Sequence, residues 1–223
     1  MNIRAGAGSK ISIAWGNGRI TTHSFDTETE MRFINDYFPG RSKPPQGRWF
    51  QVEISAENQD CRIIGFYMGG DMNNNNLDVS NCPELEELYY FDYNIDETYN
   101  LDLSRNVALK YLNCARNGIA SLDLSHCTEL EVLDCYGNRL TSLDLSRNTA
   151  LVELKCGGNR LSHLWLKNNH LLEQLYCEFN EMKRIYIDCL PKLRVAEFEV
   201  CNQINDATKR QIQEIIAENN AEE

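Results

Sequence analysis

A repeat of 21 residues runs through the middle of the chain. Four consecutive copies, with no insertion or deletion between them, begin at Leu109, Leu130, Leu151 and Leu172. The second copy reads "LEVLDCYGNRLTSLDLSRNTA". A degenerate copy begins at Leu193, a copy three residues longer begins at Leu85, and "RIIGFYMGG" near Ile64 is a weaker first strand. One such unit cannot bury its leucines alone, so the repeat predicts a stacked solenoid with a continuous core.

The first half of each copy predicts a short strand. In "LKYLNC", Leu112 and Cys114 share one side of the strand and point inward, while Asn113 points outward. Stacked copies then form a parallel sheet, and the return half, "LDLS", closes each coil. The pattern L-x-x-L-x-L/C-x-x-N-x-L is that of leucine-rich repeats. We therefore expect an α/β solenoid, a right-handed coil with its parallel β-sheet on the concave face.

Two inward columns recur once in every copy. The first is a cysteine ladder of Cys114, Cys135, Cys156 and Cys177, and the second is an asparagine ladder of Asn117, Asn138, Asn159 and Asn180. An inward asparagine has donors and an acceptor for the backbone groups of the turn after each strand. In the last coil Phe198 takes the cysteine position and Cys201 the asparagine position. On the return side, Cys82 and Cys127 occupy the position held elsewhere by Asn106, Asn148 and Asn169.

The motif L-x-x-L-x-C-x-x-N-x-L-x-x-L-D-L-S-x-N, from Leu130 to Asn148, resembles the bacterial 21-residue leucine-rich repeats, including the cysteine-ladder branch of the internalins. The resemblance covers roughly residues 77–204. It implies a bacterial, non-enzymatic binding module, secreted or displayed at the cell surface. The start of the chain, "MNIRAGAGSKISIAWGNGR", has no uninterrupted apolar segment and therefore predicts no signal peptide, which leaves a cytoplasmic location open as well.

The two ends do not repeat and predict caps. Residues 1–55 suggest an α+β cap: a hairpin around Gly16-Asn17-Gly18, a helix in "TETEMRFINDYFPG" that starts near Thr27, and a strand in "WFQVEIS". Residues 56–204 form the solenoid. Residues 205–223 predict a capping helix, with Asn205 or Asp206 at its start and its isoleucines on one side.

Charge and hydropathy exclude two classes of partner. The formal net charge is −11 at pH 7, from 22 basic and 33 acidic residues. Such a field repels phosphate backbones and anionic lipid. No apolar run approaches the roughly 20 residues that a membrane helix needs. We expect no nucleic-acid partner and no membrane insertion.

The cysteines predict no metal, cofactor or catalytic site. Stacked strands place successive ladder sulfurs about 4.8 Å apart in a line, so four of them cannot converge on one zinc ion. Parallel side chains disfavour disulfides, and buried thiols are poor nucleophiles. The repeated Asp102, Asp123 and Asp144 indicate surface architecture, and their column ends at Trp165 and Tyr186, an exposed apolar spot or a contact with a neighbour. We expect no enzyme; the alternative is a site in the N-terminal segment.

The outward face of the sheet is the candidate binding surface. Its residues vary from copy to copy while the inward residues hardly change, as a recognition surface on a fixed scaffold requires. The candidate ligand-binding residues are Tyr89, Tyr111, Asn113, Asp134, Tyr136, Glu153, Lys155, Tyr176 and Glu178. They favour a protein ligand. A glycan stacked on the same tyrosines, and a plain solvated face on which Asp134 and Lys155 pair, are the alternatives.

Overall fold

A computed structural model describes the backbone of strands within residues 2–5, 10–14, 20–24, 29–32, 53–56 and 63–70, and then residues 79–80, 82–92, 101–187, 190–200 and 202–221. Side chains are described from Val79 onward, except those of residues 91 and 92. The statements below concern these parts of the chain.

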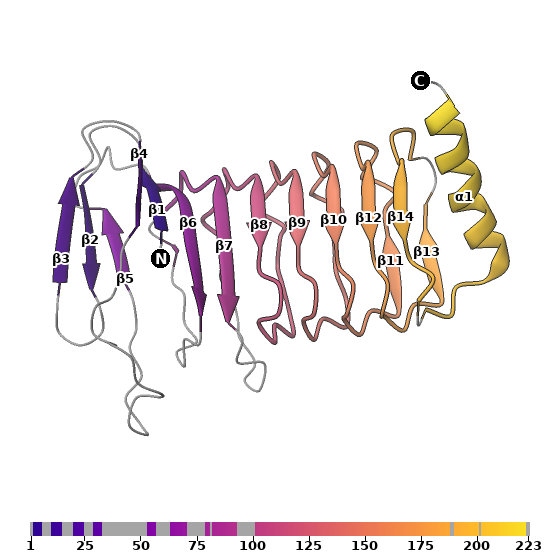
Figure 1. The fold of residues 1–223 in the computed structure, drawn as a ribbon, viewed down its shortest axis with the longest axis horizontal. Helices are drawn as coiled ribbons and strands as arrows, with labels where there is room; N and C mark the ends of the chain where they lie inside the picture. Colours follow the sequence, from indigo (N-terminus) through magenta and orange to yellow (C-terminus); the bar gives the residue numbers. More distant parts are fainter. Residues whose placement is uncertain are drawn as a thin grey trace.

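The coils stack along a single sheet of nine strands (Figure 1). Its parallel part runs, in spatial order, through β14 (Val195–Glu197), β12 (Gln174–Tyr176), β10 (Glu153–Lys155), β9 (Val132–Asp134), β8 (Tyr111–Asn113), β7 (Glu87–Asp92) and β6 (Ile63–Gly70). From β8 to β14 each residue pairs with the residue 21 positions later, as Leu112 does with Leu133. The predicted parallel sheet is confirmed, and β6 confirms the weaker first strand near Ile64.

The inward leucines make this register the stable one. In β8, β9, β10 and β12 the central residue, such as Leu133 or Leu154, is fully buried, while its two neighbours are half-buried on the outer side. A shift of one residue would turn the leucine outward, and each buried leucine contributes about 1.5–3 kcal/mol. The four ladder cysteines lie in the same core, with none of their surface exposed.

Asparagine side chains bind the backbone from one coil to the next. Asn138 Nδ2 donates to the carbonyl oxygens of Cys114 at 2.9 Å and Cys135 at 3.0 Å, and its Oδ1 accepts from the amides of Asn117 and Ile119. Buried asparagines on the return side each donate Nδ2 to two backbone carbonyls, but their Oδ1 atoms have no partner among the described residues: Asn106, Asn148 and Asn169. Backbone groups that turn inward after each strand thus find partners without water.

The last coil departs from the expected asparagine position. Asn202 donates Nδ2 to the carbonyls of Cys177 and Phe198 and accepts from the amide of Met182 at 3.0 Å. Strict periodicity assigns the asparagine position of this coil to Cys201. That prediction is wrong, because the residue that makes the ladder hydrogen bonds is Asn202, one residue later. An amide can supply these hydrogen bonds and a thiol cannot, so the chain gains one residue here and brings Asn202 into place.

A second, two-stranded sheet lies in the return halves of two coils. It consists of β11 (His163–Trp165) and β13 (Arg184–Tyr186), which pair in parallel (Figure 1). Leu164 and Ile185 point into the core. The core is therefore closed by one sheet on the strand side and, in these two coils, by another on the return side.

The N-terminal strands form two groups. β1 (Asn2–Ala5) pairs antiparallel with β6, and β4 (Thr29–Arg32) pairs antiparallel with β1, so both extend the main sheet. β2 (Lys10–Ala14), β3 (Ile20–Ser24) and β5 (Glu53–Ala56) form a separate sheet, in which β2 and β3 confirm the predicted hairpin. The helix predicted from Thr27 is wrong over Thr29–Arg32, because pairing with β1 outweighs the local helical pattern; its later residues lie outside the described part.

Helix α1 (Asp206–Ala221) closes the C-terminal end of the stack (Figure 1). The side chain of Asn205 caps it, accepting the Thr208 amide at 2.9 Å. Ile212 is fully buried in the core. Asn219 Nδ2 donates to the carbonyls of Leu190 and Leu193, which ties the helix to the last return segment. The helix therefore covers leucines that a further coil would otherwise cover.

Candidate binding face

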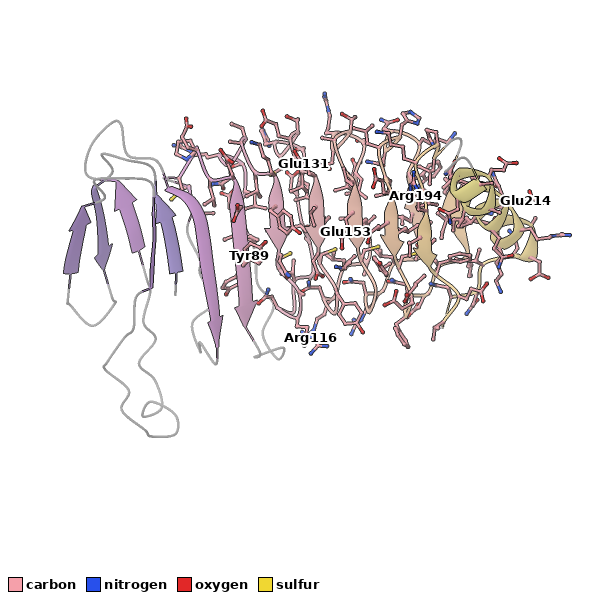
Figure 2. All side chains as sticks on the ribbon, turned by 45° about the horizontal axis from the view of Figure 1, so that its top comes forward. Tyr89, Arg116, Glu131, Glu153, Arg194 and Glu214 are labelled. Atoms are coloured by element: carbon pink, nitrogen blue, oxygen red, sulfur yellow. The ribbon has the colours of Figure 1, made fainter. Side chains whose placement is uncertain are left out.

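The outward side chains of the main sheet lie in rows across the coils. From β7 to β12 the outward residues are half-buried, packed edge to edge with their counterparts on the neighbouring strands. In Figure 2, Tyr89 and Glu153 lie over the middle of the sheet, and Arg116 lies beyond the ends of the strands. The structure therefore brings the nine candidate residues onto one continuous surface.

One row is held by a polar network around Asp134. Its carboxylate accepts from Asn113 Nδ2 on the neighbouring strand at 3.3 Å and from the Tyr136 amide at 3.1 Å. The equivalent bond one coil earlier joins Asn113 Oδ1 to the Ala115 amide. Burial among these neighbours raises the pKa of Asp134, although the Tyr136 amide and the nearby Lys155 act in the opposite direction. The side chain is fixed in place before any ligand arrives.

Lys155 forms its ion pair with Glu153, two residues earlier on β10. The hydrogen bond that Lys155 donates to Glu153 within this ion pair is the main reason why the pKa of Lys155 is raised. Lys155 therefore pairs along its own strand and not across strands with Asp134, the pairing that the alternative of a plain solvated face contained. Lys155 Nζ also lies 5.5 Å from the ring centroid of Tyr176, and Tyr176 donates its hydroxyl to Gln174 at 3.1 Å.

The other candidate tyrosines also have ordered neighbours. Tyr89 and Tyr111 stack across β7 and β8 with ring centroids 5.6 Å apart and an interplanar angle of 21°. The guanidinium of Arg116 lies 5.7 Å from the centroid of the Tyr136 ring. An aromatic ring that is already ordered loses little side-chain entropy when a partner binds. Arg116 belongs to this face, and the sequence analysis did not include it among the binding residues.

The turn after each strand requires a left-handed backbone at one position. This position is occupied by Arg116 (φ 60°), Gly137 (φ 69°), Gly158 (φ 65°) and Phe179 (φ 55°). A Cβ added at Gly158 would lie 3.2 Å from Gly137 Cα and 3.4 Å from Tyr136 Cζ. The glycines therefore let the Tyr136 ring lie close against the backbone of the next coil. Arg116 and Phe179 tolerate a conformation that side chains rarely adopt, and Phe179 remains 46% exposed.

Neighbouring Gly157 leaves room for Glu178 in the same way. A Cβ at Gly157 would lie 3.0 Å from the carbonyl oxygen of Glu178 and 2.9 Å from its Oε1. Glu178 Oε2 is shielded from solvent and has no hydrogen-bond partner among the described residues. The carboxylate of Glu178 thus lies over the glycine with one acceptor unused.

The thiols are placed for packing rather than reaction. Among the described cysteines, the five at positions 114, 127, 135, 156 and 177 are free and buried, and Cys82 is buried as well. Burial raises the pKa of Cys127 to about 11, and it raises the pKa of Cys135 and of Cys156 well above the usual value of a thiol. A thiol held neutral in this way has little nucleophilic thiolate at neutral pH.

The described part of the chain contains neither a cluster of metal ligands nor a membrane-spanning helix. No three His, Cys, Asp or Glu side chains there converge in a way that could hold a metal ion. No helix in that part is long and apolar enough to cross a membrane. The alternative of an enzymatic site in residues 1–55 falls on side chains outside the described part.

Solved structures with the same arrangement of coils supply the comparison. The functional domain of InlJ from Listeria monocytogenes, which includes a cysteine ladder, is 33% identical, with a TM-score of 0.54 over 62% of this chain and 30% of that chain. The protein is a leucine-rich repeat solenoid that resembles the cysteine-ladder internalins. The leucine-rich repeat domain of APL1 is 22% identical, with a TM-score of 0.56, and covers 65% of this chain and 39% of that one.

A third structure, of the LRIM1/APL1C complex, is 19% identical with a TM-score of 0.52, over 65% of this chain and 27% of that chain. This chain spans less than half of the length of each of these three proteins. No protein-family model matches the chain, and no curated protein does. This chain therefore shares its repeat architecture with all three solved structures, and it shares the cysteine ladder with InlJ.

Proposed function

We propose that this solenoid is a non-enzymatic module that binds a protein through the outward face of its main sheet. The observation that carries the proposal is the contrast between the two sides of each strand. Inward residues repeat from coil to coil and are buried, whereas the outward strand residues differ between neighbouring coils and several of them are held in ordered contacts. A rigid scaffold that presents varied, ordered side chains meets the physical requirements of specific recognition.

Charge suggests the kind of partner. The outward strand positions carry the carboxylates of Glu87, Asp134, Glu153 and Glu197, and one ammonium group, that of Lys155. Because Glu153 already binds Lys155, the remaining carboxylates leave the face negative. Cationic side chains of a partner would find complementary charge there, between tyrosines that supply apolar area. A solved structure that shares this fold is that of a complex between two proteins, LRIM1 and APL1C.

The test combines affinity capture with a measured dissociation constant. The purified chain captures proteins from cells or secretions, and each identified partner is then titrated by interferometry. Tyr136→Ala combined with Tyr176→Ala should weaken a true partner by about tenfold or more, since each removes an ordered aromatic contact worth about 1 kcal/mol or more. A return-side variant, Ser142→Ala, is the matched control and should bind normally.

Two results would contradict the assignment of this face. The first is a partner that binds the folded double tyrosine variant as tightly as it binds the original chain. The second is a partner whose binding is lost through Ser142→Ala alone. A glycan array probed with the same proteins tests the other ligand class, and saturable glycan binding that depends on the two tyrosines would favour that alternative.

A further inference from the structure

The two-stranded sheet of the return side presents a second surface. Its inward residues, Leu164 and Ile185, enter the same core as the leucines of the main sheet, so its outward residues point away from the opposite side of the coils. Four outward side chains stand in register there. They form what is called the return patch below: His163 beside Arg184, and Trp165 beside Tyr186.

The solenoid does not need these side chains to form its coils. One coil earlier, the positions of His163 and Trp165 are held by Ser142 and Asp144. The Asp144 carboxylate accepts the Ser146 amide at 2.9 Å, and this coil closes without a return strand. The same arrangement closes the coil before it. Two adjacent coils therefore replace a small, polar turn with bulky side chains at positions where the scaffold does not require them.

The aromatic side chains of the return patch are rigid and accessible. The rings of Trp165 and Tyr186 stack with centroids 3.7 Å apart and an interplanar angle of 6°, and the His163 ring meets Trp165 edge-on at 6.1 Å. His163 Nδ1 also lies 2.9 Å from the Ser162 hydroxyl. Trp165 nevertheless remains 47% exposed. Ordered but exposed tryptophan, tyrosine and arginine side chains are the types that dominate the energy of protein interfaces.

The charge of the return patch differs from that of the whole molecule. Lys183 and Arg184 are exposed at the start of β13 and Lys167 is exposed just after β11, while the exposed carboxylates nearby are those of Glu181 and, in the preceding coil, Asp144. The chain as a whole has a formal charge of −11. A local excess of cations around stacked aromatic rings is complementary to carboxylates on a partner, whereas the main sheet is negative and complementary to cations.

We propose that the return patch is a second docking surface, which binds an acidic protein segment carrying aromatic or aliphatic side chains. The apolar side chains of the segment pack on Trp165 and Tyr186, and its carboxylates pair with Arg184 and Lys183. An Arg–carboxylate pair can form two parallel hydrogen bonds and so gives orientation as well as attraction. The surface is independent of the main sheet, so both faces can be occupied at once.

The test uses variants that the chain itself supplies. His163→Ser with Trp165→Asp introduces the residues that the preceding coil has at these positions, Ser142 and Asp144. Arg184→Ser with Tyr186→Asp introduces the same pair in the following coil. The fourfold variant therefore has residues that this scaffold already accommodates. The probe is a library of synthetic peptides in which glutamate alternates with leucine or tyrosine. A matched library has lysine in place of glutamate. Binding is followed by fluorescence anisotropy at low and at physiological salt, with circular dichroism to verify folding.

We expect acidic peptides to bind the return patch of the folded original chain despite its net negative charge, and we expect the fourfold change to leave any binding of the lysine peptides, whose charge suits the main sheet, unaffected. The fourfold variant should bind the acidic peptides at least about tenfold more weakly, and Tyr136→Ala with Tyr176→Ala on the main sheet should have no effect on this binding. The proposal is overturned if no acidic peptide binds at millimolar concentration, or if binding survives the fourfold change.

Two further outcomes would assign the return patch to a different occupant and would also overturn the proposal. Sedimentation velocity could show concentration-dependent association that the fourfold variant abolishes, in which case the occupant is a second copy of the chain. Heparin could displace every bound peptide and bind equally tightly through the same residues, in which case the surface selects anions in general. Failure of the main-sheet experiment leaves these results unaffected.

Discussion

Replacement of Asn159 by alanine should destabilise the solenoid by an amount that follows from its hydrogen bonds. Asn159 Nδ2 donates to the carbonyls of Cys135, Cys156 and Gly157, and Oδ1 accepts from the Leu140 amide at 3.0 Å. After the change the three carbonyls retain one donor each, from Asn138, Asn180 and the Gly137 amide. The amide of Leu140 loses its partner.

The loss of these hydrogen bonds sets the expected destabilisation. An unpaired buried amide costs about 1–3 kcal/mol, and the weakened carbonyl pairing adds about 1 kcal/mol. Asn159→Ala should therefore lower the free energy of unfolding by about 2–4 kcal/mol, measured by urea denaturation. Asn168→Ala is the matched control: Asn168 is exposed and donates to the Ser146 carbonyl at 3.0 Å, so its loss should cost less than about 1 kcal/mol.

Asn159→Asp separates hydrogen bonding from the loss of volume. Its shape is nearly unchanged, but an oxygen replaces the donor that faces three carbonyls, so the folded state should favour the protonated acid and raise its pKa above about 3.9. A raised carboxyl pKa means that the folded state binds more protons, and the deficit relative to the original chain should shrink as the pH falls toward about 4. Equal costs for Asn159→Ala and Asn168→Ala, or a deficit of Asn159→Asp that does not change with pH, would refute the reasoning.

Three further changes test the packing and the thiols. Leu133→Ala should cost about 2–5 kcal/mol in urea denaturation, because the side chain is fully buried and its neighbours cannot close the space. Cys135→Ser should cost about 1–3 kcal/mol, since the hydroxyl enters an apolar site, whereas Cys135→Val should be mild and leave binding intact; loss of binding in folded Cys135→Val would contradict a purely structural role. Because burial raises the pKa of the Cys127 thiol to about 11, iodoacetamide at neutral pH should modify Cys127 only after unfolding, as mass-spectrometric mapping of native and urea-treated protein would reveal.

Several features of this protein could be predicted from its sequence, because a repeat carries its own register. A spacing of 21 between leucines such as Leu112 and Leu133 specifies which residues pair, since each coil can cover the next only when identical positions stack. The same spacing placed the cysteines in one buried column and the candidate tyrosines on one face. The C-terminal helix was also predictable, because the pattern of Ile212, Ile215 and Ile216 is local.

The rest depended on contacts between residues that no local pattern connects. Thr29–Arg32 forms a strand because β1 lies beside it, although its sequence favours a helix. The sequence does not decide whether Lys155 pairs with Asp134 or with Glu153, and only the geometry of the side chains on β10 selects Glu153. Asn202 replaces the position of Cys201 because inward carbonyls need an amide donor, whichever residue the period assigns.

Periodicity by itself determined the architecture of this protein, because apolar residues at a regular spacing are buried together when the repeats stack on one another. The tertiary structure decided which exposed side chains act together. Trp165 and Tyr186 interrupt a column of aspartates in the sequence, and only the parallel pairing of β11 and β13 stacks their rings at 3.7 Å. Side-chain contacts of this kind depend on distances and angles between coils, which a sequence spacing does not contain.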